Sequence, residues 1–264
     1  MKEYLVIGNP IEHSLSPKLH NQWIKENNIK AIYKKQKLTS NDLSELISKI
    51  KDTKISGVNV TVPFKNEIIT HLDELTYEAK ATQSVNTIYL DTNKVVGHNT
   101  DIVGFEKAIQ QTNYKTEGKT ILILGAGGVV PSIIFALYKM KALSITICNR
   151  TKSKAEQLKN LFNDLKIIEW GESTNFDMII NATSVGLNDN EELDFDFSKV
   201  GNNKFFYDVI YNPKETQFLE KAKKLGNKIE NGKKMFIYQA AASFKIWHNV
   251  HPTINTKLSE FLDL

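Results

Sequence analysis

The sequence predicts an α/β protein of two domains, the first with a mixed sheet and the second with a doubly wound parallel sheet. From residue 120 onward, short apolar runs alternate with amphipathic stretches, which is typical of parallel strands joined by crossover helices. A similar alternation starts separately in the first hundred residues, so these residues do not simply extend the same sheet. A length of 264 residues allows one large or two small domains.

The first hundred residues predict strands at 4–7, 31–33, 55–60 and 87–90, with helices near 17–27 and 41–50. A turn at 91–93 separates the last of these strands from Val95-Val96, which indicates an antiparallel hairpin at one edge of the sheet. Residues 102–111 then predict a helix that leads into the second domain.

The second domain is expected to contain strands at 120–124, 144–148, 166–168, 178–180, 205–209 and 228–230. Three helices are expected in this domain. The first begins at Pro131, a favoured first-turn residue, and the others cover about 153–163 and about 214–224. After Gly232, residues 236–248 are apolar on one face and could pack back onto the first domain, followed by a final helix from about residue 253. We therefore expect residues 1–101 and 238–264 to form the first domain and residues 102–237 to form the second.

The composition narrows the function classes. The chain has 34 basic and 30 acidic residues, and its lysines are scattered rather than grouped, which argues against nucleic acid as the main partner. The apolar run near Met1 is too short for a signal peptide, and no stretch approaches the roughly 20 apolar residues of a membrane span, so we expect a soluble, cytoplasmic protein. The single cysteine, Cys148, excludes an internal disulfide and a multi-cysteine metal site, and we expect it to be a buried strand residue.

A glycine-rich loop, Gly125-Ala126-Gly127-Gly128, lies between the strand at 120–124 and the following helix. Glycine permits the tight turn and lets backbone N–H groups approach a pyrophosphate at the helix N-terminus, which is typical of dinucleotide-binding folds. Val130 occupies the third position, where such loops have a small residue. The alternative is a tight turn that binds no nucleotide.

Arg150 is the only arginine in the chain, and it follows the second strand of this domain. In dinucleotide-binding folds this position carries either an acid that binds a ribose 2′-hydroxyl or an arginine that accepts a 2′-phosphate. Because the chain has no acid there, Arg150 favours NADP over NAD. Its flat, bidentate guanidinium suits phosphate better than lysine does. The alternative is a surface arginine without such a role.

Two loops of the first domain carry candidate ligand-binding side chains. Ser14 and Ser16 follow the first strand, two residues apart, and in an extended loop both could reach one ligand carboxylate. Ser16 directly precedes Pro17, so helix capping is an alternative role for its hydroxyl. In the run after residue 58, the strand alternation predicts that Asn59 and Thr61 point one way while Val60 and Val62 point into the core.

Lys65 lies just past this strand, whose end is set by Pro63. Together with Asn86 and Asp101 it forms a candidate chemical site, although asparagine and aspartate also serve as turn residues. If a nicotinamide cofactor binds in the second domain, the chemistry needs a group to move a proton while the hydride moves.

Taken together, these motifs resemble the shikimate dehydrogenase family, whose members reduce 3-dehydroshikimate with NADPH in chorismate and aromatic amino-acid biosynthesis. The resemblance covers nearly the whole chain, and the order and spacing of the motifs make it specific. The motifs are Ser14-Leu15-Ser16-Pro17 with His20-Asn21, Asn59 to Lys65, Val85-Asn86-Thr87, Asn99-Thr100-Asp101, the Gly125 loop, Asn149-Arg150-Thr151, Asn181 to Gly186, Asp208 to Pro213, and Gln239-Ala240-Ala241.

The resemblance implies a role for each matching residue. Ser14 and Ser16 would bind the substrate carboxylate, and Lys65 and Asp101 would flank the reacting oxygen, with Asp101 orienting Lys65. The pocket would be completed by Thr61, Asn86, Tyr211 and Gln239. NADP(H) would be bound by Gly125, Ala126, Gly127, Gly128, Val129, Asn149, Arg150, Thr151, Lys154, Val209 and Gly232 in a Rossmann domain, and no metal is predicted.

Two departures from the family pattern stand out: Val129-Val130-Pro131 replaces smaller residues after the glycines, and Tyr77 stands where the family often has an acid, so no role is assigned to it. The alternatives are a quinate/shikimate dehydrogenase with relaxed cofactor use, or a non-catalytic NADP-binding sensor module. We expect a small-molecule substrate, a monomer or homodimer, and a reaction in a cleft between the two domains.

Overall fold

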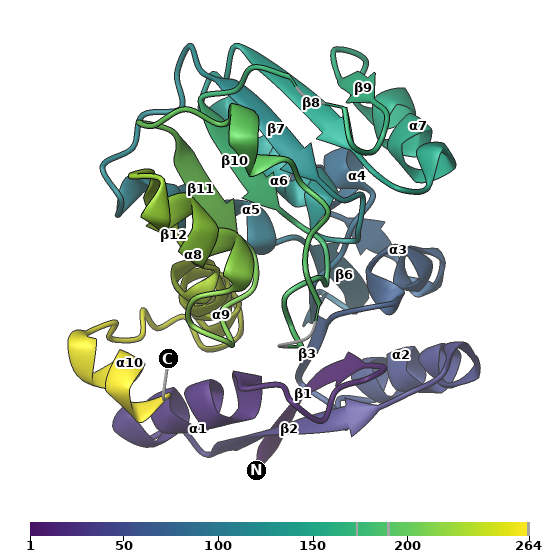
Figure 1. The fold of residues 1–264 in the computed structure, drawn as a ribbon. Helices are drawn as coiled ribbons and strands as arrows, with labels where there is room; N and C mark the ends of the chain where they lie inside the picture. The colour runs from purple at the N-terminus through teal and green to yellow at the C-terminus, as the bar shows by residue number, and fades with distance from the viewer. Residues whose placement is uncertain (173, 189–190, 263–264) are drawn as a thin grey trace. The chain divides into compact units, whose positions relative to one another are not determined.

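The structure is a computed structural model that describes residues 1–172, 174–188 and 191–262, and the chain divides into two compact units (Figure 1). Unit 1 comprises Met1–Gly104 and the C-terminal segment that begins at Ile237, and unit 2 comprises Phe105–Phe236. Residues 263–264 of the predicted first domain lie outside the described residues. Helices α5 (Asp101–Gln110) and α9 (Lys233–His248) each contain one of the boundaries between the units.

Unit 1 contains a six-stranded mixed sheet in the order β2-β1-β3-β5-β6-β4. Its strands are β1 (Lys2–Gly8), β2 (Ala31–Lys37), β3 (Gly57–Val60), β4 (Glu74–Leu75), β5 (Thr87–Asp91) and β6 (Lys94–His98). Strand β1 is parallel to β2 and β3, whereas β5 is antiparallel to both β3 and β6, as the predicted hairpin requires. The carboxyl ends of β1, β3 and β6 and the amino end of β5 therefore meet at one edge of the sheet.

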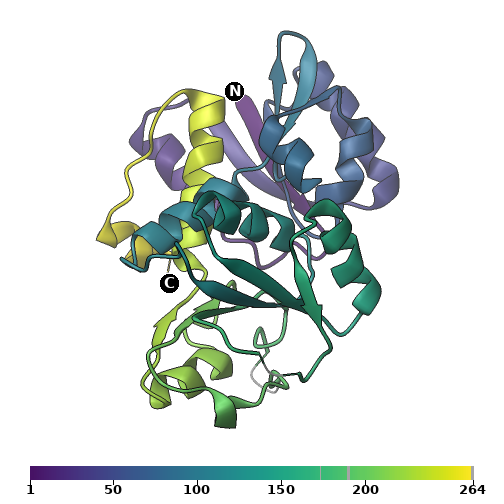
Figure 2. The ribbon, with the colours of Figure 1, turned by 90° about the horizontal axis from the view of Figure 1, so that it is seen from above.

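Helices cover both faces of this sheet. Helix α2 (Leu43–Lys51) packs its buried leucines and isoleucines against Leu5, Val58 and Ile88 on one face. Helices α1 (Ser16–Glu26) and α9 contribute Trp23 and Trp247 to an aromatic cluster on the other face. Figure 2 shows α9 lying along β1 and β2.

The C-terminal segment packs on unit 1, as the sequence predicts. The Trp247 indole donates a hydrogen bond to the carbonyl of Ile88 at 3.1 Å, and the Trp23 indole donates to the carbonyl of Thr253, also at 3.1 Å. The final helix, α10 (Thr256–Phe261), begins after Asn255, whose side chain accepts from the backbone N–H of Leu258 at 3.0 Å.

Two details of unit 1 differ from the sequence-based expectation. Val62 is 57% exposed rather than part of the core, because β3 ends at Val60 and the chain turns before the next helix, whose N-cap is Pro63. Between residues 64 and 82, where no elements were predicted, the chain forms short ones. They are α3 (Phe64–Glu67), the 3-10 helix η2 (Ile68–His71), β4 and α4 (Tyr77–Thr82); a further 3-10 helix, η1 (Ser40–Asp42), precedes α2.

Unit 2 contains a six-stranded, all-parallel sheet in the order β12-β11-β10-β7-β8-β9. Its strands are β7 (Thr120–Leu124), β8 (Ser144–Cys148), β9 (Lys166–Ile168), β10 (Met178–Asn181), β11 (Phe205–Asp208) and β12 (Lys228–Glu230). The strand order reverses between β7 and β10, as in a doubly wound fold. In such folds ligands bind at the carboxyl ends of the strands at this reversal.

The faces of the second sheet are covered by helices on both sides. Its helices are α6 (Val130–Lys139), α7 (Lys152–Leu161), α8 (Gln217–Lys224) and the 3-10 helix η3 (Phe197–Lys199). Figure 1 shows α8 in front of this sheet and α6 behind it. Helix α8 begins at Gln217 rather than near residue 214, because Thr216 caps it by accepting from the backbone N–H of Leu219. Cys148 is buried at the end of β8, as expected.

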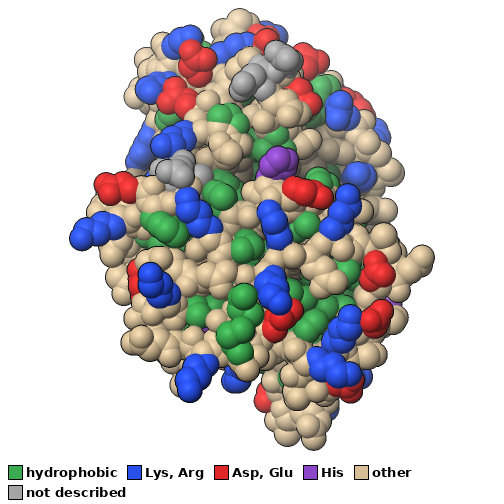
Figure 3. Space-filling view, turned by 90° about the horizontal axis from the view of Figure 1, so that it is seen from below, with side chains coloured by type: hydrophobic (Ala, Val, Ile, Leu, Met, Phe, Trp, Pro, Cys, Tyr) green, Lys and Arg blue, Asp and Glu red, His purple; other side chains and the backbone are tan. Residues whose placement is uncertain are grey.

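One face of the molecule is mixed in charge. On the face shown in Figure 3, Lys and Arg side chains are interspersed with Asp and Glu side chains. Among the described residues, no helix has the length and apolar character needed to cross a membrane.

Candidate functional site

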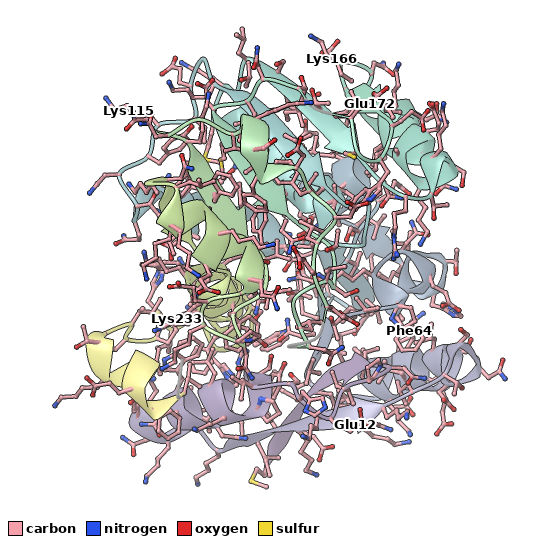
Figure 4. The ribbon with its side chains drawn as sticks, viewed as in Figure 1. Glu12, Phe64, Lys115, Lys166, Glu172 and Lys233 are labelled. Carbon is pink, nitrogen blue, oxygen red and sulfur yellow. The ribbon has the colours of Figure 1, made fainter. Side chains whose placement is uncertain are left out.

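Lys65 and Asp101 form an ion pair in unit 1. Lys65 lies in α3, next to Phe64, which is labelled in Figure 4, and Asp101 is the first residue of α5. The Lys65 Nζ lies 2.5 Å from Asp101 Oδ2, and the two side chains are only 12% and 8% exposed. Both residues follow strands that end at the same edge of the sheet, β3 and β6, which explains how residues 36 positions apart meet.

The other oxygen of the Asp101 carboxylate is also held. Asn86 Nδ2 donates to Asp101 Oδ1 at 2.9 Å, and the backbone N–H of Asp101 donates to Asn99 Oδ1 at 3.0 Å. The position of Asp101 at the N-terminus of a ten-residue helix adds the favourable field of the helix dipole. Asn86 and Asp101 are thus bound to each other and are not simple turn residues.

Gln239 of α9 joins the same cluster. Its Oε1 accepts from Asn86 Nδ2 at 3.4 Å, so the structure brings together four predicted site residues, Lys65, Asn86, Asp101 and Gln239. Tyr211 belongs to unit 2, where its ring stacks on Phe236 at a centroid distance of 4.8 Å. Burial raises the pKa of the Tyr211 phenol, which therefore keeps its proton.

Ser14 lies in the loop between β1 and α1, and Ser16 is the first residue of α1. The N-cap of α1 is Leu15, and neither serine caps the helix through its side chain, so the capping role considered for Ser16 is not observed. The backbone N–H of Ser16 donates to Ser14 Oγ at 3.3 Å, and Ser16 is buried. No hydrogen bond joins the Ser16 hydroxyl to another described residue. A hydroxyl that is not used within the protein is available to a ligand.

Thr61 lies close to this loop because the two strands that precede them are neighbours. Its backbone N–H donates to the carbonyl of Ile7 at 2.9 Å, and Gly8 lies so close that an added Cβ would be 2.6 Å from Thr61 Cγ2. Glycine at position 8 therefore permits the loop after β1 and the end of β3 to approach each other. Ser14, Ser16 and Thr61 all follow strand ends at the edge where Lys65 and Asp101 are placed.

In unit 2 the glycine loop follows β7. Gly125 has a positive φ of 109°, and an added Cβ would lie 2.8 Å from the carbonyl oxygen of Ala182, so only glycine fits. Gly127 and Gly128 are exposed, and an added Cβ at Gly127 would have no neighbour nearer than 3.8 Å. This leaves the backbone before α6 open to a pyrophosphate, so the loop fits a dinucleotide. Val130 is fully buried in the core of unit 2.

Arg150 follows β8 and is exposed. Within the described residues it has no hydrogen-bond or ion-pair partner, in contrast to Lys152, which pairs with Glu169 at 2.5 Å. Asn149 Nδ2 donates to the carbonyl of Thr151 at 2.7 Å, and Lys154 lies in the first turn of α7. The guanidinium is therefore available to an anion beside the start of a helix.

Val209 and Gly232 lie against each other after β11 and before α9. A Cβ added at Gly232 would lie only 2.0 Å from the carbonyl oxygen of Val209, and the backbone N–H of Gly232 donates to the carbonyl of Ile210 at 3.0 Å. These contacts fix the backbone at two residues predicted to lie beside the cofactor.

Asp208, at the end of β11, is completely buried and has no cationic partner among the described residues. Burial raises the pKa of its carboxyl to about 6, although hydrogen bonds oppose this rise. Thr216 Oγ1 donates to it at 2.6 Å, Ile210 N at 3.0 Å and Asn181 Nδ2 at 3.2 Å. Asp208 thereby joins β10, β11 and the start of α8.

Two family models match the chain. The shikimate dehydrogenase substrate binding domain matches residues 6–88, and shikimate / quinate 5-dehydrogenase matches residues 106–191. The chain is 53% identical over 263 residues to the shikimate dehydrogenase (NADP(+)) of Pelagibacter ubique, covering 100% of this chain and 99% of that protein. The chain belongs to the shikimate dehydrogenase family. The resemblance predicted from its motifs is confirmed.

Solved structures agree with this family. The shikimate dehydrogenase of Aquifex aeolicus is 35% identical, with a TM-score of 0.90 and coverage of 100% of this chain and 97% of that one. The shikimate 5-dehydrogenase of Thermus thermophilus, solved with NADP(H) and shikimate, is 28% identical, with a TM-score of 0.90 and coverage of 100% and 99%. The predicted two-domain α/β architecture is thus confirmed.

Three residues that contribute to the structure of the site, Asn99, Thr100 and Asp208, were not predicted as site residues. Thr100 donates its backbone N–H to Asn86 Oδ1 at 2.7 Å, and Asn99 binds both the backbone of Asp101 and Thr82 Oγ1. Both lie in the motif Asn99-Thr100-Asp101, and an asparagine two residues before an acid at a helix start is a signal for helix capping. Asp208 lies in the motif Asp208 to Pro213, but no capping pattern marks it as a residue of the site.

Proposed function

We propose that this member of the shikimate dehydrogenase family catalyses the reversible NADPH-dependent reduction of 3-dehydroshikimate to shikimate, with Lys65 and Asp101 at the reacting oxygen. The observation that carries the assignment is the Lys65–Asp101 ion pair, nearly buried at the sheet edge and linked to Asn86 and Gln239. A binding or sensing protein does not need a proton-transfer pair.

Each residue has a distinct part in the proposed reaction. The Lys65 ammonium donates a hydrogen bond to the ketone oxygen and gives it a proton as the carbon accepts a hydride, so that an alcohol and a neutral lysine result. NADPH supplies the hydride when it is bound. Asp101 stays ionised and keeps Lys65 aimed at that oxygen. In the reverse direction the neutral lysine takes the hydroxyl proton back.

The remaining predicted residues bind the two ligands in this proposal. Ser14 and Ser16 donate hydrogen bonds to the substrate carboxylate, and Thr61, Asn86, Gln239 and Tyr211 complete its pocket. The backbone of residues 125–129 binds the pyrophosphate, and Arg150, with Asn149, Thr151 and Lys154, binds the 2′-phosphate end. Val209 and Gly232 lie beside the nicotinamide. The cytoplasmic location and the monomeric or homodimeric state expected from the sequence stay predictions.

The substitution Lys65→Met tests the assignment. It keeps the length of the side chain but removes the proton, so we expect kcat to fall by about 100- to 10,000-fold in either direction. The measurement is the absorbance of NADPH with shikimate and NADP+, repeated with quinate and with NAD+ to separate the possible substrates and cofactors.

The matched control is Lys34→Ala, which removes an exposed lysine paired with Glu3 in the same unit and should leave kcat unchanged. Circular dichroism and NADPH binding establish that each variant is folded. A folded Lys65→Met enzyme with wild-type turnover would show that Lys65 does not transfer the proton.

A further inference from the structure

Four polar side chains lie buried behind the Lys65–Asp101 pair. Tyr33, Asn59, Thr87 and Asn86 come from β2, β3 and the amino end of β5, and none is more than 6% exposed. Buried polar groups need hydrogen-bond partners. A network that satisfies all of them restricts which residues can occupy these positions, and it adds no apolar burial. Their arrangement therefore calls for an explanation beyond packing.

The four side chains form a chain of hydrogen bonds that ends on Asp101. The Tyr33 hydroxyl donates to Asn59 Oδ1 at 2.6 Å, and Asn59 Nδ2 donates to Thr87 Oγ1 at 3.2 Å. Thr87 Oγ1 then donates to Asn86 Oδ1 at 3.0 Å, and Asn86 Nδ2 donates to Asp101 Oδ1 at 2.9 Å. Every link donates in the same direction, from the phenol toward the carboxylate.

Backbone groups fix the orientation of the two carboxamides in this chain of hydrogen bonds. Asn59 Nδ2 also donates to the backbone carbonyl of Asn86 at 3.0 Å, so its amide must face that way and its oxygen must face Tyr33. Asn86 Oδ1 accepts the backbone N–H of Thr100 at 2.7 Å, so its Nδ2 must face Asp101. Burial also raises the pKa of the Tyr33 phenol well above its ordinary value, and the phenol stays a donor. Reversing one carboxamide would set like groups against each other.

We propose that Tyr33, Asn59 and Thr87 are positioning residues that orient the Asn86 carboxamide and, through it, the carboxylate of Asp101. The proposal rests on the function proposed for Lys65 and Asp101. Hydrogen bonds aligned in one direction polarise each other, so the last amide is a stronger donor than it would be alone. With Oδ1 held by this amide, Oδ2 is directed at Lys65, whose ammonium is thereby held for the substrate oxygen.

The chain can be interrupted at two points without changing the shape of the core. Tyr33→Phe removes the first donor but keeps the ring that stacks on His20 at 4.2 Å, and Thr87→Val removes the central hydroxyl. We expect each to lower kcat for shikimate oxidation, and the single-turnover rate of hydride transfer, by about three- to tenfold. KM for shikimate and for NADP+ should change by less than about twofold, because the ligand-binding side chains remain.

The double variant and a conservative variant separate positioning from general destabilisation. Both substitutions interrupt the same chain of hydrogen bonds. The double variant Tyr33→Phe with Thr87→Val should therefore have a kcat only slightly lower than that of the less active single variant. Thr87→Ser restores the hydroxyl and should restore kcat to near the wild-type value, whereas a requirement for threonine packing alone would not be met by serine.

Tyr4→Phe is the matched control. Tyr4 is a buried tyrosine of the same aromatic cluster, 1% exposed, and its hydroxyl is not one of the links between Tyr33 and Asp101. This variant should keep the wild-type kcat, even if its stability falls.

Three results would overturn the proposal: wild-type kcat in both Tyr33→Phe and Thr87→Val, an equal loss of kcat in Tyr4→Phe, or losses that multiply in the double variant. These outcomes differ from a failure of the proposed function, in which the wild-type chain itself would not oxidise shikimate.

Discussion

Lys65 and Asp101 form a nearly buried ion pair, and burial of two charges carries a desolvation cost that the Coulomb attraction alone often does not offset. The hydrogen bond that Asn86 donates to the Asp101 carboxylate reduces this cost. The ion pair therefore lowers the stability of the fold, but its neighbours hold it in one geometry. Proton transfer to a fixed substrate oxygen needs such a fixed geometry.

Arg150 should decide between NADPH and NADH. Its guanidinium is exposed and has no partner among the described residues, so its removal should disturb little else. We expect Arg150→Ala to weaken NADPH binding by about 10- to 100-fold through the loss of charge-assisted hydrogen bonds to the 2′-phosphate. The measurement is the Kd of each cofactor by fluorescence titration.

Two comparisons sharpen this test. NADH has no 2′-phosphate, and its Kd should change by less than about twofold, whereas Arg150→Lys should retain part of the NADPH affinity because charge remains without the bidentate fork. Equal weakening of both cofactors would contradict a role in binding the 2′-phosphate.

Among single residues, those with a local signal could be predicted and those that depend on distant partners could not. Lys65 and Asp101 were predicted from their places after strands and in motifs. Tyr33 gave no such signal, since its role follows from a contact with Asn59, 26 residues away, that exists only once β1, β2 and β3 have assembled. Register across three strands is not encoded in any one of them.

At the level of elements, the turn between β12 and α9 depends on Gly232. A Cβ there would lie 2.0 Å from the backbone oxygen of Val209, and backbone cannot move aside as a flexible side chain can. We expect Gly232→Ala to lower the free energy of unfolding by about 2 kcal/mol or more and to weaken NADPH binding. Urea denaturation and cofactor titration measure the two effects.

Gly201→Ala is the matched change in the same unit, because a Cβ at Gly201 would have no neighbour within 4 Å and its φ is not positive. It should leave both quantities within about 0.5 kcal/mol of wild type. If Gly232→Ala behaved in the same way, the turn would have to be looser than its contacts indicate.

Helices and strands could be predicted where the sequence has a regular apolar pattern. The parallel strands of unit 2 are continuous apolar runs and were predicted at nearly their observed positions, for instance β7 (Thr120–Leu124). The short elements between residues 64 and 82 were not, because α3 has four residues and β4 has two, fewer than a period can establish. Val62 was wrongly assigned to the core for a related reason, since the alternation of β3 stops two residues before it.

At the scale of the whole molecule, His20, His248 and Asp208 are among the described groups that link stability to pH. Burial lowers the pKa of His20 to about 3 and that of His248 to about 4, and it raises the pKa of Asp208 to about 6. Below pH 6.5 both histidines bind a proton in the unfolded chain but not in the folded chain. The two histidines therefore lower the stability of the fold as the pH falls. Asp208 acts in the opposite sense between about pH 4 and 6, since the folded chain then holds the extra proton.

Because these effects oppose each other, a single substitution is more informative than the total pH dependence. His20 is 1% exposed, stacks on Tyr33 and has no hydrogen-bond partner at either ring nitrogen among the described residues. His20→Phe keeps an aromatic ring at this position and removes the titration. Between pH 4 and 6 we expect the slope of unfolding free energy against pH to decrease by up to about 1.4 kcal/mol per pH unit, the value for one proton.

Urea unfolding followed by tryptophan fluorescence measures this slope, with Trp23 and Trp247 as probes in unit 1 and Trp170 as a probe in unit 2. Trp23→Phe is the control: it removes the hydrogen bond to Thr253 in the same aromatic cluster and should lower stability at every pH without altering the slope, since no proton is involved. An unchanged slope in His20→Phe would mean that His20 binds its proton equally in the folded and unfolded chain, in spite of its burial among aromatic rings.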